Sequence, residues 1–310
     1  MRYMFIDTDT ASDDAVAIVM ALKDKNTKVV GITAVSGNVP VDLACKNALI
    51  SAEMAGTYMP PVYRGADRPL VREITYSYET HGSDGMGEMN LPEAKTPLTP
   101  GNGVLKMIEE IYRYKGELEI VALGPLTDIA LAVRLDPGIV PLIKRLVIMG
   151  TTGFGPGNVT PVAEFNIWAD PEACDIVLKS GINQCYVGWD MCTGDAVITK
   201  EEIDDVMKNG TDCAKFCIRC NQTLMNLNQR RFGSPCLDMA DPVAMAVALW
   251  PQQVEKDTVY AYTFVECQKG ECYGMVVSDY TNNAGKPANA HMCRSIHIQT
   301  MKELLLAHIQ

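Results

Sequence analysis

The chain has 310 residues, of which 47% are hydrophobic, and a formal net charge of −11 at pH 7. This length is sufficient for a sizeable core in one large domain or two smaller ones. No apolar run reaches the length of a membrane span and no Lys/Arg-rich block stands out, which argues against a membrane protein and against a nucleic-acid groove.

The cysteines and the start of the chain indicate the compartment. Eleven cysteines, an odd number scattered along the chain, are typical of reduced thiols rather than of a disulfide framework. An acid cluster begins at residue 7, which leaves no room for a signal peptide. We therefore expect a cytoplasmic protein.

The first twenty residues carry the most informative pattern. The apolar run 3–6 predicts a buried strand, and an apolar helical pattern follows, for which Ser12 is the expected N-cap. Four acids lie between the strand and the helix or in its first turn: Asp7, Asp9, Asp13 and Asp14. Open α/β sheets bind ligands at this end of a strand, and four crowded carboxylates need a cation or protons to neutralise them. Because His and Cys are missing from the cluster, Ca²⁺ or Mg²⁺ is a better candidate than zinc.

Strand and helix patterns alternate through the first 190 residues. Such alternation predicts βαβ units, and hence an α/β fold with a Rossmann-like, mostly parallel central sheet flanked by helices. The expected strands are 28–35, 118–123, 145–149 and 185–188, and the expected helices are 41–55, 126–135 and 171–179, the last capped by Asp170.

The later part of the chain has a different pattern. Residues 199–251 are expected to be mostly helical, and 259–266 and 273–278 alternate like an antiparallel strand pair, a small C-terminal addition to the sheet. A strand at 296–299 and a helix at 301–308 are expected to end the chain. No linker or repeat divides the sequence, so we expect a single domain over residues 1–310.

Three long segments rich in Gly, Pro and Asn interrupt these patterns, at 76–103, 150–166 and 228–240. Long loops in a compact fold are usually functional or disordered. Their Asn, Asp and Glu side chains can bond both the hydrogens and the lone pairs of hydroxyl groups, so they suit a hydroxyl-rich ligand.

Read together, several motifs resemble the inosine-uridine preferring nucleoside hydrolase family. They fall in the family's order and span residues 3–250. The matching segments are 6–15, 36–39 with Asn47, 81–85, 122–128, 149–150, 164–173 and 239–242. The resemblance implies the nucleoside hydrolase fold, a Ca²⁺ at the strand ends, hydrolysis of the N-glycosidic bond of a ribonucleoside in nucleobase salvage, and a homodimer or homotetramer.

The resemblance also implies roles for individual residues. The implied metal ligands are Asp9, Asp14, Asp241 and the backbone carbonyl of Leu123. The implied ribose contacts are Asp13, Asn38, Met149, Asn158, Glu164, Phe165 and Asn166, and Asp7 is implied to support the metal ligands from behind. The reaction passes through an oxocarbenium-like state, so it needs a fixed attacking water and a base, which by resemblance is Asp9.

One position departs from the family pattern. The residue before the distal aspartate is typically a histidine that protonates the base, or a tryptophan that stacks on it, but here it is Ala240. Another group can donate the proton, the leaving base can be one that needs no such donor, such as a bulky modified purine, or the protein can bind nucleosides without turnover. The candidate donors are His81, Arg230, Arg231 and Tyr262. We expect the segment 221–231, which includes Gln229, Arg230 and Arg231, to border the base.

Two other interpretations account for less of the chain. Asp7 and Asp9 also satisfy the Asp-x-Asp pattern of haloacid-dehalogenase phosphatases, but that interpretation leaves the later motifs unexplained. The cysteines at 213, 217 and 220 have the spacing of a radical iron–sulfur loop. In a helix these positions share one face, so we expect a buried stripe of small residues instead.

Overall fold

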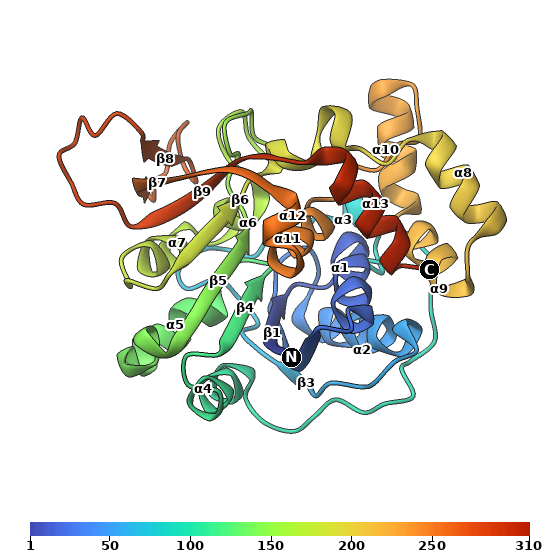
Figure 1. Cartoon of the computed structure of the whole chain (residues 1–310), viewed down its shortest axis with the longest axis horizontal. Coiled ribbons are helices and arrows are strands. Elements are labelled where there is room, and N and C mark those ends of the chain that lie inside the picture. The colour runs from blue at the N-terminus through green and yellow to red at the C-terminus, as the bar shows by residue number, and fades with distance from the viewer.

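The structure, a computed structural model, describes residues 1–310 and has one continuous nine-stranded sheet (Figure 1). The strand order is β3-β2-β1-β4-β5-β6-β9-β7-β8. Neighbours from β3 to β9 are parallel, whereas β7 pairs antiparallel with both β9 and β8. The strands are β1 Arg2–Thr8, β2 Thr27–Ala34, β3 Val62–Arg64, β4 Leu118–Ala122, β5 Ile143–Met149, β6 Gln184–Val187, β7 Glu255–Val265, β8 Val276–Asp279 and β9 Ala290–Ile296.

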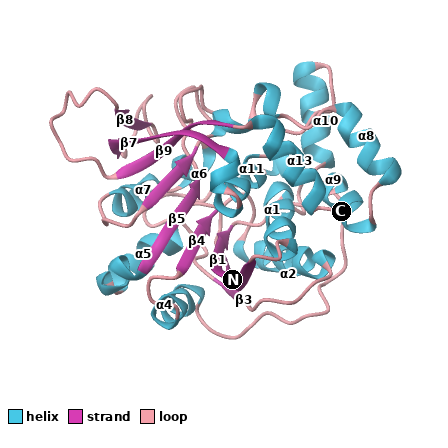
Figure 2. Cartoon of the chain, in the orientation of Figure 1, coloured by secondary structure: helices cyan, strands magenta, loops and turns pink.

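Helices cover both faces of this sheet (Figure 2). The hydrophobic core on one side of the sheet contains residues of α1 Ser12–Lys23, α2 Val41–Ala55, α8 Lys200–Asn209, α9 Asp212–Arg219, α10 Gln222–Phe232, α11 Ala240–Leu249, α12 Pro251–Val254 and α13 Ile298–His308. The core on the other side contains residues of α4 Gly103–Arg113, α5 Thr127–Leu135 and α7 Pro171–Leu178. Successive residues of β1 divide between the two cores, with Met4 and Ile6 in the first and Phe5 in the second, as strand geometry requires.

The mixed α/β architecture confirms the expected fold class, and most elements lie where the pattern predicts them. The Asp170 carboxylate accepts the backbone N–H of Ala173 and caps α7, also as expected. Three details were wrong. The last strand is β9 rather than 296–299, Ala11 rather than Ser12 is the N-cap of α1, and α10 extends into the segment 228–240 that was expected to be a loop.

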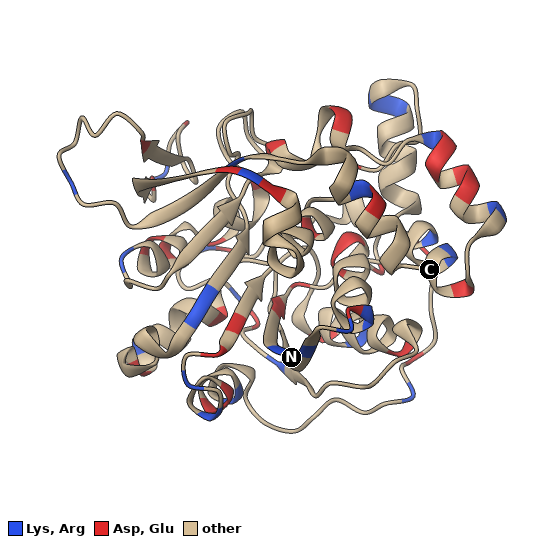
Figure 3. Ribbon diagram, viewed as in Figure 1, with Lys and Arg blue, Asp and Glu red and all other residues tan.

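Charged side chains are spread over many elements of the fold, with a run of acids along α8 (Figure 3). None of the helices combines the length and the apolar character needed to cross a membrane. The cysteines at positions 213, 217 and 220 lie buried on α9 and at its C-terminal cap, where they pack against α1 and α2.

Candidate active site

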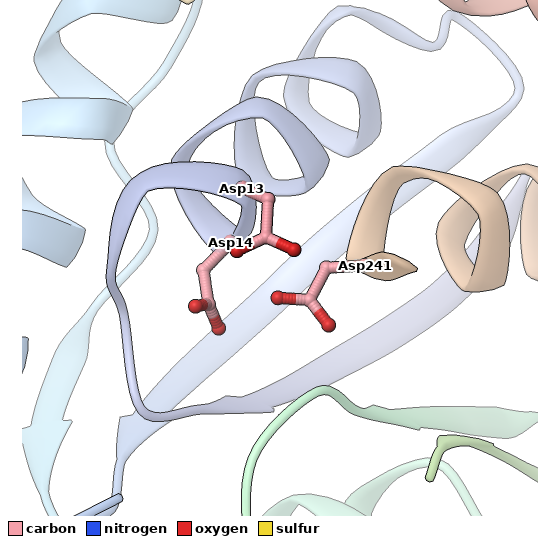
Figure 4. A group of neighbouring side chains, drawn as sticks. All are labelled: Asp13, Asp14 and Asp241. Carbon is pink, nitrogen blue, oxygen red and sulfur yellow. The ribbon is translucent and has the colours of Figure 1, made fainter. Parts of the chain in front are cut away.

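The carboxyl ends of the parallel strands bring three acids together (Figure 4). Asp13 and Asp14 lie in the first turn of α1, directly after β1, and Asp241 lies in the first turn of α11. One oxygen of each carboxylate lies within 4.8 Å of those of the other two. Residues more than two hundred positions apart therefore meet at one point because two helices begin at the same edge of the sheet.

Asp9 lies beside this group and is fully buried. Its Oδ2 accepts the backbone N–H of Asn38 at 2.5 Å, whereas its Oδ1 has no hydrogen-bond partner. Gly37 makes the close approach possible, since a Cβ atom there would lie 2.1 Å from Oδ2 of Asp9. The structure thus holds one oxygen of Asp9 and leaves the other free.

Burial and mutual repulsion dominate the electrostatics of the cluster. Burial, and next the charge of Asp13, raise the pKa of Asp14 to about 7. The pKa values of Asp9 and Asp241 are raised well above the ordinary range, by burial and then by neighbouring acids. His81 approaches Asp13 at 3.9 Å, but burial lowers the pKa of His81 and so disfavours its charged form. The negative charge of the carboxylates is therefore not balanced by His81.

These residues fit a hard divalent cation. Asp9 Oδ1 and Asp13 Oδ1 are buried without hydrogen-bond partners, so each has lone pairs to offer. Leu123, directly after β4, lines the same cavity as Asp241, and its carbonyl accepts the side-chain N–H of Asn166 at 2.6 Å. The donor set consists of oxygen atoms only, which favours Ca²⁺ or Mg²⁺ over softer metals.

A cavity of about 400 Å³ opens beside the acid cluster. Glu164 lies on its wall and caps α6 Phe165–Ala169, accepting the backbone N–H groups of Asn166 and Ile167, and burial raises its pKa to about 7. Asn158 Oδ1 accepts the N–H of Phe165 at 3.0 Å. These contacts fix polar groups on the wall before any ligand binds, as a binding site for a small polar molecule requires.

The structure brings most of the expected residues to this cavity. Those that line it are Asp13, Asn38, His81, Leu123, Met149, Asn158, Glu164, Phe165, Asn166, Arg231, Ala240 and Asp241. Asp9 and Asp14 lie fully buried next to the lining residues. Gln229 and Arg230 are exposed and do not line the cavity, and Tyr262 lies on β7, where its hydroxyl accepts a hydrogen bond from Lys286.

Asp7 lies in β1, outside the group of three converging acids. It is fully buried in β1, and burial followed by the charge of Asp128 raises its pKa far above the ordinary value. Both carboxylate oxygens of Asp7 are buried without a hydrogen-bond partner. Asp7 is not a member of the group formed by Asp13, Asp14 and Asp241.

His81 is fixed at the cavity by a hydrogen bond. It ends the short helix α3 Tyr78–His81, and its Nδ1 lies 2.7 Å from the Ser12 hydroxyl. The glycine-rich loop that follows packs against the start of α10. A Cβ at Gly87, whose φ is +67°, would lie 2.6 Å from the carbonyl oxygen of Cys220.

Sequence reasoning missed several residues of the cavity. They are Thr75, Tyr76, Ser77, Glu79, Thr80, Val159, Trp189 and Asp238. Asp238 offered a signal, because it is an acid three positions before Asp241 in a segment already identified. Leu224 and Leu227 also line the cavity, and they lie in the segment 221–231 that was expected to border the base.

Known proteins share this fold and sequence pattern. Residues 4–303 match a family described as inosine-uridine preferring nucleoside hydrolase. The chain belongs to this family. It is therefore a hydrolase that acts on the N-glycosyl bonds of ribonucleosides.

Individual nucleoside hydrolases are similar over most of their length. Probable uridine nucleosidase 1 of Oryza sativa subsp. japonica is 34% identical over 250 residues, 80% of this chain and 77% of that protein. The pyrimidine-specific ribonucleoside hydrolase RihB of Escherichia coli (strain K12) is 31% identical over 288 residues, 93% and 90% of the two chains. The plant nucleoside hydrolase PpNRh1 superposes with a TM-score of 0.93 at 27% identity, covering 99% of this chain and 98% of that one. A purine-preferring ribonucleoside hydrolase from Gardnerella vaginalis superposes with a TM-score of 0.91 at 26% sequence identity, covering 99% of this chain and 98% of that one.

Proposed function

We propose that the protein is a Ca²⁺-dependent ribonucleoside N-ribohydrolase that releases free base and ribose in cytoplasmic nucleobase salvage. The observation that carries the proposal is the convergence of Asp13, Asp14 and Asp241 beside a cavity walled by polar side chains. A site for a nucleoside needs a cation that binds the ribose diol and, next to it, space for the nucleobase. This cavity is large enough for such a ligand.

Asp9, Asp14, Asp241 and the Leu123 carbonyl would hold the cation. When bound, a divalent cation would supply charge that orients the cis hydroxyls of ribose and lowers the pKa of an attacking water. Asp9 accepts the proton of that water through its free Oδ1, while the Asn38 N–H fixes the other oxygen.

The ribose is held by groups on the cavity wall. The carboxylates of Asp13 and Glu164 accept hydrogen bonds from its hydroxyls, and the side chains of Asn38, Asn158 and Asn166 bind there too. Met149 and Phe165 line the same site and exclude water from the ring. Orientation of the sugar against the water supplies part of the rate enhancement.

Departure of the base needs a group other than residue 240, since Ala240 offers neither a proton nor an aromatic face. Of the candidate donors, His81 and Arg231 line the cavity, whereas Arg230 and Tyr262 do not. Ala240 also favours the second candidate function, a nucleoside-binding protein of the same fold with weak turnover, because such a protein needs no donor. A base that leaves readily, such as a modified purine, would equally suit the space beside Ala240.

Release of free base from a panel of ribonucleosides, with and without chelator, separates these functions. The panel should include 7-deaza and other modified bases. Hydrolysis that chelator stops and Ca²⁺ restores is the expected result. Thermal stabilisation by nucleosides without base release would support the binding protein, and hydrolysis unaffected by chelator would reject the metal role.

We also propose that residues 1–310 form a single domain and that the protein is a homodimer or homotetramer. The single domain is supported by one sheet that contains strands from both ends of the chain. Light scattering coupled to size-exclusion chromatography measures the oligomeric state, and a monomer at micromolar concentration would reject the second part.

A further inference from the structure

Ser12 and His81 form a buried hydrogen-bonded pair at the cavity. Ser12 is the first residue of α1 and is fully buried, and its hydroxyl oxygen lies 2.7 Å from Nδ1 of His81. His81 ends α3, and its side chain lines the cavity. In a neutral histidine one ring nitrogen donates and the other accepts, so the direction of this hydrogen bond decides which nitrogen carries the proton.

The hydroxyl group of Ser12 is the donor in this pair. It has no other hydrogen-bond partner, so only Nδ1 of His81 can accept its hydrogen. If Nδ1 carried a proton, it would donate to the hydroxyl oxygen, and the buried O–H of Ser12 would be left without an acceptor, which is unfavourable. A doubly protonated ring would leave the same O–H unsatisfied, and burial also disfavours that charged ring by lowering the pKa of His81.

The second ring nitrogen of His81, Nε2, therefore carries the proton. Nε2 has no hydrogen-bond partner within the protein, and the ring lines the cavity, so its N–H is available to a ligand. With the proton on Nε2 the ring offers the cavity a donor. With the proton on Nδ1 it would offer a lone pair instead.

The neighbouring carboxylate of Asp13 favours the opposite tautomer. Asp13 follows Ser12 in the first turn of α1 (Figure 4), and its Oδ1 lies 3.9 Å from Nδ1 of His81. This distance is too long for a hydrogen bond, and Oδ1 is buried without a partner. Without the Ser12 hydroxyl, a proton on Nδ1 would turn toward this free acceptor. The Ser12 hydroxyl thus opposes the attraction of Asp13 for that proton.

We propose that Ser12 is a positioning residue that holds His81 as a neutral imidazole with its proton on Nε2, so that His81 donates a hydrogen bond to the bound nucleoside. The kinetic part of this inference rests on the proposed function. It matters there because Ala240 supplies no donor. The tautomer itself is a property of the free protein and can be measured without a substrate.

Nuclear magnetic resonance gives the first test. Long-range ¹H–¹⁵N correlation spectra of protein labelled with ¹⁵N-histidine distinguish a protonated ring nitrogen from an unprotonated one by chemical shift. The chain has four histidines, and the signals that disappear in His81→Gln belong to His81. At about pH 8, where an ordinary histidine is neutral, we expect His81 of the wild type to carry its proton on Nε2.

Ser12→Ala gives the second test. It removes the hydroxyl, so the proton of His81 should move to Nδ1, toward Asp13, and kcat/KM for the best ribonucleoside substrate should fall by ~10-fold or more because a donor has become a lone pair. Ser51→Ala is the matched control. Ser51 is also fully buried, and its hydroxyl donates to the carbonyl of Asn47 at 2.7 Å within α2. It should change neither the tautomer nor kcat/KM.

A double variant separates positioning from a structural role. If Ser12 acts through His81, Ser12→Ala should have little further effect on kcat/KM when His81→Gln is already present. An equal loss in the presence and absence of His81 would show that Ser12 acts independently of the ring, which overturns the inference.

The outcomes distinguish this inference from the function on which its kinetic part rests. A wild-type protein that hydrolyses no ribonucleoside rejects the proposed function, whereas the spectra still decide the tautomer. A proton on Nδ1 of His81 in the wild type overturns the inference, and this result does not depend on whether Ser12→Ala folds. A folded Ser12→Ala protein with the proton still on Nε2 overturns it as well.

Discussion

At the scale of single residues, Asp9 shows how the protein separates two tasks within one carboxylate. The Asn38 N–H holds Oδ2, so the side chain cannot rotate freely, while Oδ1 is buried without a partner. Burial raises the pKa of Asp9, which makes its carboxylate a stronger base. A close glycine backbone is part of this arrangement, because any larger residue at Gly37 would displace the carboxylate.

Substitution of Asp9 tests its role as the base. Asp9→Asn keeps an oxygen that can accept the Asn38 N–H but removes the group that takes the proton. We expect kcat to fall by ~10²–10⁴-fold, the usual contribution of a positioned general base. Steady-state kinetics with excess Ca²⁺ measures the change, and more than about a tenth of the wild-type rate in this variant or in Asp9→Ala would contradict the assignment.

At the scale of elements, the loop after α3 links the cavity to the helices beside it. Asn47 of α2 donates to the carbonyl oxygens of Thr10 and Asp84, and so ties this loop to the start of α1. Gly87 lies against the carbonyl of Cys220 at the end of α9. His81 depends on this packing for its position.

Gly87→Ala should therefore loosen the loop. The residue has a φ of +67°, which is unfavourable for alanine, and the added Cβ would lie 2.6 Å from a backbone oxygen. We expect a loss of about 1–3 kcal/mol of unfolding free energy, measured by urea denaturation, and a higher KM. Gly285→Ala is the control, because it has a similar φ of +60° but nothing within 4 Å. Equal effects of the two substitutions would show that strain alone, without the contact, is responsible.

The sequence predicted an element well where the pattern that indicates it lies within a few consecutive residues, and poorly where the element depends on tertiary contacts. The acids after β1 and the alternating pattern were enough for the sheet and for one half of the cluster, because both signals lie within a few consecutive residues. The strand β9 was misplaced because its sequence contains His291, Arg294 and Ser295, and its stability comes from pairing with β6 and β7. Trp189 became part of the site only through tertiary packing, which no local pattern records.

At the scale of the whole molecule, the acid cluster destabilises the folded state when no cation is bound. The pKa of Asp14 rises from 3.8 to about 7 in the folded protein, and those of Asp9 and Asp241 are also raised well above the ordinary value. The folded state therefore binds more protons than the unfolded one. The contribution of these groups to the free energy of unfolding is fully present below their pKa values in the unfolded chain, near 4. It is lost as the pH rises through about 7.

Chelated protein should consequently have a higher Tm at about pH 5 than at about pH 8, and added Ca²⁺ should raise Tm more at the higher pH, because the cation replaces the missing protons. Scanning fluorimetry with EGTA or Ca²⁺ measures both effects. Asp241→Asn removes one of the strongly raised acids, so its Tm with EGTA should depend less on pH and its response to Ca²⁺ should be smaller than that of the wild type. An equal Ca²⁺ response at both pH values, unchanged in Asp241→Asn, would mean that the cation binds elsewhere. The carboxylates from the two ends of the chain would then be held by protons alone.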